Sequence, residues 1–282
     1  MTDAVQTTAA DKPDTLKRPL RAFVKRNGKR LVRRVASVQS SQSLVPDTPK
    51  IDGAHFPFLA GFEAEWATIR AEAEAVLAYR DEIPGFQEVS PDQYRLAKGK
   101  SWRTHFLYGF GERLATNTRL TPRTAELLEG VPNLQTAMFS ILAPGYHIPA
   151  HTGVTKGILR AHLGLIVPDD HERCRIRVAD TVTAWREGEA FVFDDTYEHE
   201  VWNETAQERV ILIFDFDRPM RPVGRMLNKA VVAGVKRTAF YKDPRRNMAD
   251  AEARLEAAIA RGDQIKEALS ASRTEGPPAG RA

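Results

Sequence analysis

Residues 134–145 read LQTAMFSILAPG, a short apolar run that closes on the turn signal Pro144-Gly145. Further short apolar or alternating runs follow at 158–167, 174–178, 190–194 and 209–216. Runs of this length, separated by turn signals, are typical of β-strands in a sandwich or barrel rather than of an alternating α/β sheet. We therefore expect a mainly β fold.

Helical patterns flank this strand region on both sides. Residues 62–82 place apolar side chains at helical spacing, and a second helix is predicted to start at Thr121 with Pro122 in its first turn. Residues 247–271 read as a polar, Ala-rich helix, and residues 223–246 before it are basic. The predicted helices would therefore flank the β region rather than alternate with its strands.

Length and composition indicate one large domain with appendages. The chain has 282 residues, and its hydrophobic fraction of 42% is sufficient for a sizeable core. The single cysteine, Cys174, excludes an internal disulfide and fits a reducing compartment. No apolar run approaches the ~20 residues that cross a bilayer, and the N-terminus lacks the apolar core of a secretory signal. We expect a cytoplasmic protein, and peripheral contact with the inner face of the membrane stays an open alternative.

The charge is distributed unevenly along the chain. Nine Lys or Arg and no acid fall between Lys17 and Arg34, although the net charge of the whole chain is only +4. We expect residues 1–46 to form a largely disordered basic arm. Residues 17–34 and 221–246 suit contact with an anionic membrane, and a solvated tail is the simpler interpretation. Nucleic-acid binding is disfavoured, because the rest of the chain is acidic and carries no nucleic-acid motif.

Two histidines lie at the ends of predicted strands. His151 precedes the strand at 158–167, and His199 follows the strand at 190–194. A lone histidine is most often a satisfied polar side chain, but two at strand ends can meet at the mouth of a sandwich or barrel. Neutral imidazoles bind Fe(II), Zn and Cu alike, and the common iron triad adds a carboxylate two residues after its first histidine. Gly153 holds that position here, so spacing is compatible with a metal site without identifying the metal.

Basic side chains also occur within the predicted strands. Arg209 opens the strand at 209–216, and Arg160 and His162 fall on one face of the strand at 158–167 by alternation. An inward Arg on an apolar strand requires a partner, and its planar fork pairs well with a carboxylate. The simpler interpretation is an Arg–Glu pair on an exposed strand face.

Several segments in this region resemble the aspartyl/asparaginyl β-hydroxylase family. They are 139–145, 151–153, 159–165, 185–195 and 199–203. Their order and spacing agree with the family throughout, and the similarity extends from about residue 51 to residue 219. The resemblance implies a double-stranded β-helix, the jelly-roll or cupin-like fold, with flanking helices. It also implies an enzyme that uses Fe(II), 2-oxoglutarate and O₂ to hydroxylate an aliphatic carbon.

The resemblance implies a role for each candidate residue. His151 and His199 would hold Fe(II) without a carboxylate ligand, as is characteristic of this family. Ser140 and Arg209 match the positions that hold the distal carboxylate of 2-oxoglutarate. Arg160 and His162 match catalytic positions near the iron-chelating end of this cosubstrate and the substrate. Asp194 or Asp195 would act behind the ligands, by orienting a ligand histidine, or would simply form the turn after the strand.

The resemblance leaves the substrate open. Members that act on protein aspartate or asparagine often carry a second Arg where this chain has Ile158. A related branch, the lipid A acyl-chain hydroxylases, has similar segments at 54–57 and around Trp102, but carries a His-x-Asp pattern that Gly153 does not match. We expect an aspartyl- or asparaginyl-type substrate, peptidyl or free. A lipid A or other lipid acyl chain is the alternative, and a non-catalytic jelly-roll binding module is the second.

The expected organisation has three parts. Residues 1–46 are the basic arm, and residues 47–220 are the dioxygenase-like domain. Residues 221–282 comprise a basic segment, a C-terminal helix and a disordered tail that starts near Ser272.

Overall fold

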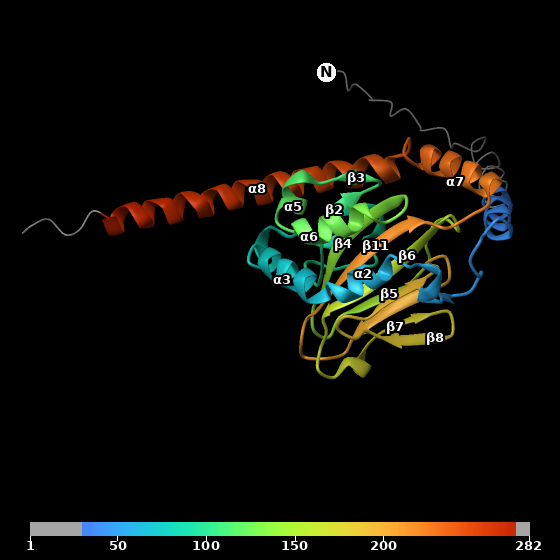
Figure 1. Cartoon of the computed structure of the whole chain (residues 1–282), viewed down its shortest axis with the longest axis horizontal. Helices are drawn as coiled ribbons and strands as arrows, with labels where there is room; N and C mark the ends of the chain where they lie inside the picture. The colour runs from blue at the N-terminus through green and yellow to red at the C-terminus, as the bar shows by residue number, and fades with distance from the viewer. Residues whose placement is uncertain (1–29, 275–282) are drawn as a thin grey trace, which may run out of the picture.

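Two sheets, each with antiparallel strand pairing, form the centre of the computed structural model, which describes residues 30–274 (Figure 1). The larger sheet has the strand order β1 (Lys50–Ile51), β9 (Ala190–Phe193), β6 (Ile158–Ile166), β11 (Arg209–Asp217), β4 (Leu134–Leu142), β2 (Trp102–Gly109) and β3 (Glu112–Arg113). The smaller sheet has the order β5 (His147–His151), β10 (His199–Asn203), β7 (Cys174–Val178) and β8 (Thr181–Ala184).

The path of the chain through these sheets is that of a double-stranded β-helix. From β4 to β11 the chain crosses repeatedly between the larger and the smaller sheet, and the β7–β8 hairpin is the only pair that stays in one sheet. The predicted mainly β jelly roll with flanking helices is therefore confirmed. Burial explains the strand patterns, because β11 is covered on both faces and is almost continuously apolar, whereas β7 alternates buried and half-buried residues.

Helices flank the sandwich. The α-helices are α2 (Leu59–Ala64), α3 (Trp66–Leu77), α4 (Phe86–Val89), α5 (Ala115–Arg119), α6 (Pro122–Glu129), α7 (Pro222–Val235) and α8 (Ala239–Thr274). Single 3₁₀ turns are η1 (Gly53–His55), η2 (Arg80–Glu82), η3 (Pro91–Gln93) and η4 (His171–Arg173). A further helix covers residues 30–41. No helix of the described part of the chain is long and apolar enough to cross a membrane.

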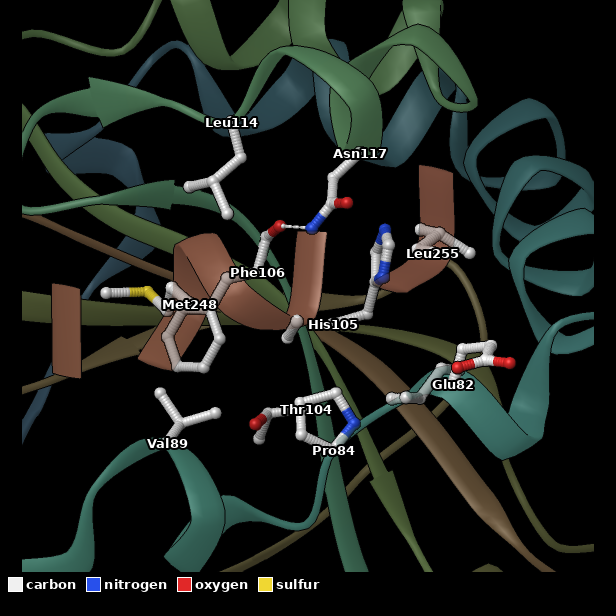
Figure 2. Close-up of a pocket in the computed structure, with 12 residues that line it drawn as sticks. Glu82, Pro84, Val89, Thr104, His105, Phe106, Leu114, Asn117, Met248 and Leu255 are labelled. Carbon is white, nitrogen blue, oxygen red and sulfur yellow. Dashed lines mark hydrogen bonds between the residues drawn. The ribbon is translucent and has the colours of Figure 1, made fainter. Parts of the chain in front are cut away.

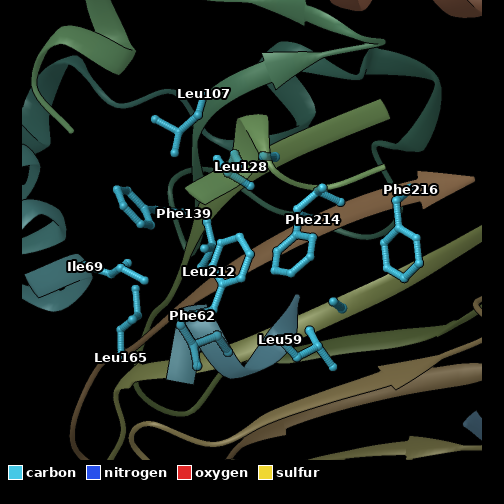
Figure 3. Close-up of a cluster of buried hydrophobic side chains, with 14 of the residues drawn as sticks. Leu59, Phe62, Ile69, Leu107, Leu128, Phe139, Leu165, Leu212, Phe214 and Phe216 are labelled. Atoms are coloured by element: carbon cyan, nitrogen blue, oxygen red, sulfur yellow. The ribbon is translucent and has the colours of Figure 1, made fainter. Parts of the chain in front are cut away.

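The outer core lies between the larger sheet and the helices α2, α3 and α6. Figure 3 shows side chains from these helices directed at those of β4, β6 and β11. Phe62 of α2 stacks on Phe214 of β11 with ring centroids 4.7 Å apart. Ile69 of α3 and Leu128 of α6 are completely buried in the same cluster. This layer makes the larger sheet a rigid support for the side chains on its opposite face.

The inner core fills the space between the two sheets. Met138 of β4 and Ile211 of β11 come from the larger sheet, and Ile176 of β7 and Val201 of β10 come from the smaller one. Inward positions on the same strands carry the predicted polar site residues. The sandwich therefore places these polar groups where water has little access.

The terminal segments are more ordered than the sequence predicts. Residues 30–41 form a helix instead of part of a disordered arm, and α8 extends to Thr274. The helix at 30–41 contacts α7, for example through the hydrogen bond from Gln39 to Asn228. The sequence alone does not show such long-range contacts. The basic positions 17–29 and the tail after Thr274 lie outside the described residues.

Candidate functional site

His151 and His199 face each other across two adjacent strands. His151 ends β5 and His199 begins β10, and the two residues are paired in the ladder. Their ring centroids are 4.1 Å apart. The sequence placed each histidine in a segment beside a strand, and the structure places both in strands of the smaller sheet. The two imidazoles are close enough to share one ion.

The tautomers of both imidazoles follow from their hydrogen bonds. His151 Nδ1 lies 2.9 Å from the carbonyl oxygen of Pro149, and His199 Nδ1 lies 2.9 Å from that of Tyr197. A carbonyl only accepts, so each Nδ1 carries the proton and each Nε2 keeps its lone pair. Nε2 of His199 is buried without a partner. These backbone carbonyls, rather than Asp194 or Asp195, orient the two rings.

Burial keeps both imidazoles neutral. It lowers the pKa of His199 to about 3, and repulsion from His151 contributes. It also lowers the pKa of His151, where the positive charge of Arg160 adds to the effect. Neutral imidazoles with free Nε2 lone pairs are the form that binds a metal ion.

Asp195 approaches this histidine pair from the loop before β10. A Cβ built on Gly153 would lie 2.1 Å from Asp195 Oδ1, so this carboxylate fills the space beside Gly153. Burial raises the pKa of Asp195 to about 6, although the charge of Arg160 opposes the shift. The neighbouring Asp194 points elsewhere and pairs with Arg218 and Lys156. Asp194 therefore anchors the loop, while Asp195 lies next to the site.

Arg209 is a buried cation without an acidic partner. Its side chain is 1% exposed, and within residues 30–274 it forms no ion pair. Nη2 donates to Ser140 Oγ at 3.2 Å, Nε is unpaired, and the guanidinium lies 4.7 Å from the Trp185 ring centroid. Burial lowers the pKa of Arg209 to about 10. Trp102 Nε1 also donates to Ser140 Oγ, at 2.9 Å. Such a cation is stabilised by an anion that binds beside it.

Arg160 and His162 share the inward face of β6, as alternation predicted. Arg160 donates two hydrogen bonds to Asp215 of β11, at 2.7 and 2.9 Å, and lies 3.7 Å from Asp195. Both ring nitrogens of His162 are buried without partners. Burial lowers the pKa of His162 well below its ordinary value, and the charges of Arg160 and Arg209 contribute. His162 therefore lies within electrostatic reach of both arginines.

A large open cavity adjoins these residues. Its volume is about 660 Å³, and it is lined by β2, β4, β5, β6, the start of α8 and the inner side of α7. His151, Arg160 and Asp195 form part of its wall, together with Ile158 and Met138. Its exposed lining is mostly apolar. His199, His162 and Arg209 are not in the lining and are almost completely buried.

A second cavity is too small for a substrate. Figure 2 shows it beside β2 and α8, with His105 and Asn117 among its walls. Its volume is about 10 Å³, the space of one water molecule. Thr104 Oγ1 and His105 Nε2, which border it, are buried without partners. A structural water is the occupant that these atoms suit.

Sequence reasoning missed Asp215 and Trp185 as parts of the site. Asp215 interrupts the apolar run of β11 at an inward position, and that isolated acid was the available signal. Trp185 was noted only as part of a family segment, although its ring covers Arg209. Among residues 30–274, no group of three His, Cys, Asp or Glu side chains is arranged to hold a metal ion. The candidate metal site therefore consists of two imidazoles.

Comparisons with known proteins identify the family of this chain. The family described as aspartyl/asparaginyl beta-hydroxylase matches residues 63–219. An ornithine lipid ester-linked acyl 2-hydroxylase from Rhizobium tropici is 44% identical over 195 residues, which cover 69% of each chain. The human aspartyl/asparaginyl beta-hydroxylase is 35% identical over 177 residues, which cover 61% of this chain and only 22% of the human protein.

Among solved structures, a prolyl-4-hydroxylase from Pseudomonas putida aligns over 57% of this chain and 100% of its own, with 18% identity and a TM-score of 0.39. The family match covers more than half of the 282 residues, and the Rhizobium relative is similar over more than two thirds of its length. The chain therefore belongs to the aspartyl/asparaginyl β-hydroxylase family.

Proposed function

We propose that the protein is an Fe(II)- and 2-oxoglutarate-dependent dioxygenase that hydroxylates an aliphatic carbon in the acyl chain of a lipid. The observation that carries most weight is the buried, unpaired guanidinium of Arg209 in the same sandwich as two adjacent neutral imidazoles. An enzyme that binds a metal ion and a dicarboxylate together needs both features.

The residues present fit an iron ion and its cosubstrate. His151 and His199 would hold Fe(II) through Nε2, because each Nδ1 is committed to a backbone carbonyl. Two protein ligands would leave room on the metal for the cosubstrate and O₂. With O₂ as the oxidant, bound iron would support the conversion of 2-oxoglutarate to succinate and CO₂ and of a substrate C–H to C–OH, with one oxygen atom entering succinate and the other the hydroxyl group.

Ser140 and Arg209 suit the distal carboxylate of 2-oxoglutarate. Ser140 Oγ already accepts hydrogen bonds from Trp102 and Arg209, so its own hydroxyl proton needs an acceptor. The unpaired Nε of Arg209 needs one too. A carboxylate placed between them would accept from both and would neutralise the buried charge. Trp185 shields the guanidinium from solvent on one side.

His162 and Asp195 are the polar groups nearest the iron-chelating end. Both nitrogens of His162 lack a partner, so its N–H would donate to the C1 carboxylate of the cosubstrate from the inward face of β6. Asp195 would hold a water molecule beside the two imidazoles. Arg160 is fixed by Asp215 and steadies Asp195 at 3.7 Å. These roles position the reactants and keep the surroundings of the metal rigid.

The cavity favours an acyl chain as the substrate and reverses the preference drawn from the sequence. On β6, beside His151, an acidic side chain would need a free cation, but Arg160 is already neutralised by Asp215, and position 158 is Ile. The cavity beside His151 is mostly apolar, and its volume of about 660 Å³ suits a flexible hydrocarbon chain. The Rhizobium relative bears the name of a lipid acyl 2-hydroxylase, and this supports the proposal.

The test is turnover by the full chain with Fe(II), ascorbate and 2-oxoglutarate. We expect succinate formation to increase when a lipid extract is added, and mass spectrometry to find lipid heavier by one oxygen atom. His199→Ala should abolish both signals. The matched control is His147→Ala, because His147 lies on the same strand pair but is exposed and contacts Glu200.

Three outcomes would contradict the proposal in different ways. Succinate formation that survives in His199→Ala would exclude the ligand assignment. Oxygen incorporated into aspartyl or asparaginyl peptides, with none in lipid, would keep the dioxygenase and restore the substrate favoured by the sequence. Binding of lipid without any turnover would indicate a non-catalytic binding module.

A further inference from the structure

The helix at residues 30–41 packs against α7. Gln39 Nε2 donates to Asn228 Oδ1 at 3.1 Å, and the backbone N–H of Arg221 donates to the carbonyl of Gln42 at 2.8 Å. Positions 39 and 42 thus contact α7 at 228 and beside its first turn at 221. Figure 1 shows this helix, in blue, next to α7 at one end of the molecule. Together the two helices form one surface.

Large apolar side chains project from both helices into solvent. Leu31 is 63% exposed and Val32 59%, while on α7 Val223 is 64% exposed and Met226 73%. On α7, Gly224 and Asn228 form the buried side, and Met226 falls opposite them on the helical wheel. Several exposed apolar residues on two neighbouring helices are typical of an interaction surface.

The same two segments are basic and contain no acid. Residues 30–46 and 218–242 have no Asp or Glu. Within the described part of the chain, Arg30, Arg33, Arg34 and Arg225 form no ion pairs, whereas elsewhere surface arginines such as Arg113 are paired with glutamates. The face therefore combines exposed apolar groups with uncompensated positive charge.

The helix α7 also borders the substrate cavity. The inner side of α7 contributes Val231, Val232 and Val235 to the cavity wall. Two more exposed apolar residues, Tyr94 at 61% and Val154 at 64%, also line the cavity. One helix thus presents Met226 to the outside and valines to the cavity.

We propose that the helix at 30–41 and the outer side of α7 form a docking face for an anionic lipid bilayer. Apolar side chains flanked by arginines match the two layers that a bilayer offers, acyl chains beneath negative headgroups. Docking through α7 brings the cavity next to the lipid, so an acyl chain enters without crossing open water. This last step rests on the proposed acyl hydroxylase function, whereas docking itself does not.

The experiment measures sedimentation of the full chain with vesicles. One set contains equal parts of phosphatidylglycerol and phosphatidylcholine, and the other contains phosphatidylcholine alone. We expect binding to the anionic vesicles only. Arg33→Gln/Arg34→Gln should weaken it by about fivefold for each cation removed. Val223→Asp/Met226→Asp should weaken it by at least about tenfold.

The controls use exposed residues outside this face. Val182→Asp on β8, where Val182 is 57% exposed, and Arg173→Gln on η4 should leave vesicle binding unchanged. Succinate formation without lipid is measured on every variant, and the docking variants should retain the wild-type rate because none of the changed residues lines the cavity. Thermal unfolding confirms that each variant is folded.

The outcomes separate docking from catalysis. Equal binding by wild type and both double variants overturns the docking face, whatever the turnover. Binding to duplex DNA but not to anionic vesicles also overturns it and makes the face a nucleic-acid surface. A wild-type chain that binds vesicles through these residues but forms no succinate supports docking and contradicts the proposed function.

Discussion

The carboxylate of Asp195 lies so close to the α-carbon of Gly153 that a Cβ at 153 would force the Asp195 side chain to move. A Cβ there would be 2.1 Å from Asp195 Oδ1, and the Gly153 N–H donates to the Asp195 carbonyl at 2.6 Å, which fixes the approach. In the common iron triad a ligand carboxylate stands two residues after the first histidine. Here that place holds Gly153, and a carboxylate arrives from the loop before β10 instead.

We predict that Gly153→Ala lowers the free energy of unfolding by about 1–3 kcal/mol, because it overfills this space. In a chain that already carries Asp195→Ala, the same Gly153→Ala change should lower the free energy of unfolding by less than about 1 kcal/mol. Urea unfolding of the wild type, both single variants and the double variant measures the coupling directly. Gly234→Ala is the control, since a Cβ at Gly234 meets nothing within 4 Å. Strictly additive losses at 153 and 195 would contradict the packing relationship.

The buried charge of Arg209 should lower the stability of the folded protein until an anionic ligand binds beside it. We predict that Arg209→Met leaves the melting temperature of the ligand-free protein unchanged or higher, because it removes an unpaired buried charge. The rise in melting temperature on adding 2-oxoglutarate with metal should disappear. Arg209→Lys keeps the charge but loses the planar fork, so its 2-oxoglutarate requirement should rise about 10- to 100-fold.

Scanning fluorimetry with and without 2-oxoglutarate measures both effects. Arg175→Met is the matched control, since Arg175 pairs with Glu204 on the outside of the sandwich. It should keep the full ligand-induced shift. An Arg209→Met chain that is still stabilised by 2-oxoglutarate would show that another cation binds the distal carboxylate.

Continuous apolar runs made part of this fold predictable. The strands at 134–142 and 174–178 appear as expected, because burial between layers leaves an unambiguous pattern. β5 and β10 were missed as strands, since HIPAH and HEVWN are polar for their length and carry the histidines. Arg209 is notable in the sequence as a cation that opens an apolar strand, and the family resemblance implies its role, but its environment required the structure.

The sequence alone does not show which side chains meet across neighbouring strands. Arg160 and Asp215 are 55 residues apart, and only the register of β6 against β11 places them opposite each other. The sequence alone does not show which side chain Arg160 pairs with. Cavity volume is likewise a property of the assembled walls. These two features, rather than any motif, moved the proposed substrate from an acidic side chain to an acyl chain.

Ile158 provides a test of substrate choice. It lies on β6 two residues before Arg160 and lines the cavity. We predict that Ile158→Arg lowers lipid hydroxylation by more than about tenfold, because it brings a charge into an apolar chain-binding space. Ile158→Leu should retain most of the activity. Product formation by mass spectrometry and succinate formation without lipid are measured together. Faster lipid turnover in Ile158→Arg would exclude the apolar chain model.

His105 makes the stability of the fold depend on pH. Its side chain is buried in β2 with Nε2 unpaired, and burial lowers its pKa from 6.5 to about 4. The unfolded chain therefore binds a proton between these pH values that the folded chain does not. This contribution to stability is complete above pH 6.5 and is lost as the pH falls towards 4.

We predict that His105→Leu removes about 2 kcal/mol of the stability difference between pH 7 and pH 5. Urea unfolding at both pH values gives that difference for each chain, and contributions from the remaining acids and histidines cancel when the two chains are compared. His55→Gln is the control, because His55 is exposed on η1 and its removal should leave the difference unchanged. Identical pH dependence in wild type and His105→Leu would mean that His105 becomes protonated in the folded protein, with the adjoining small cavity admitting enough water to solvate the charge.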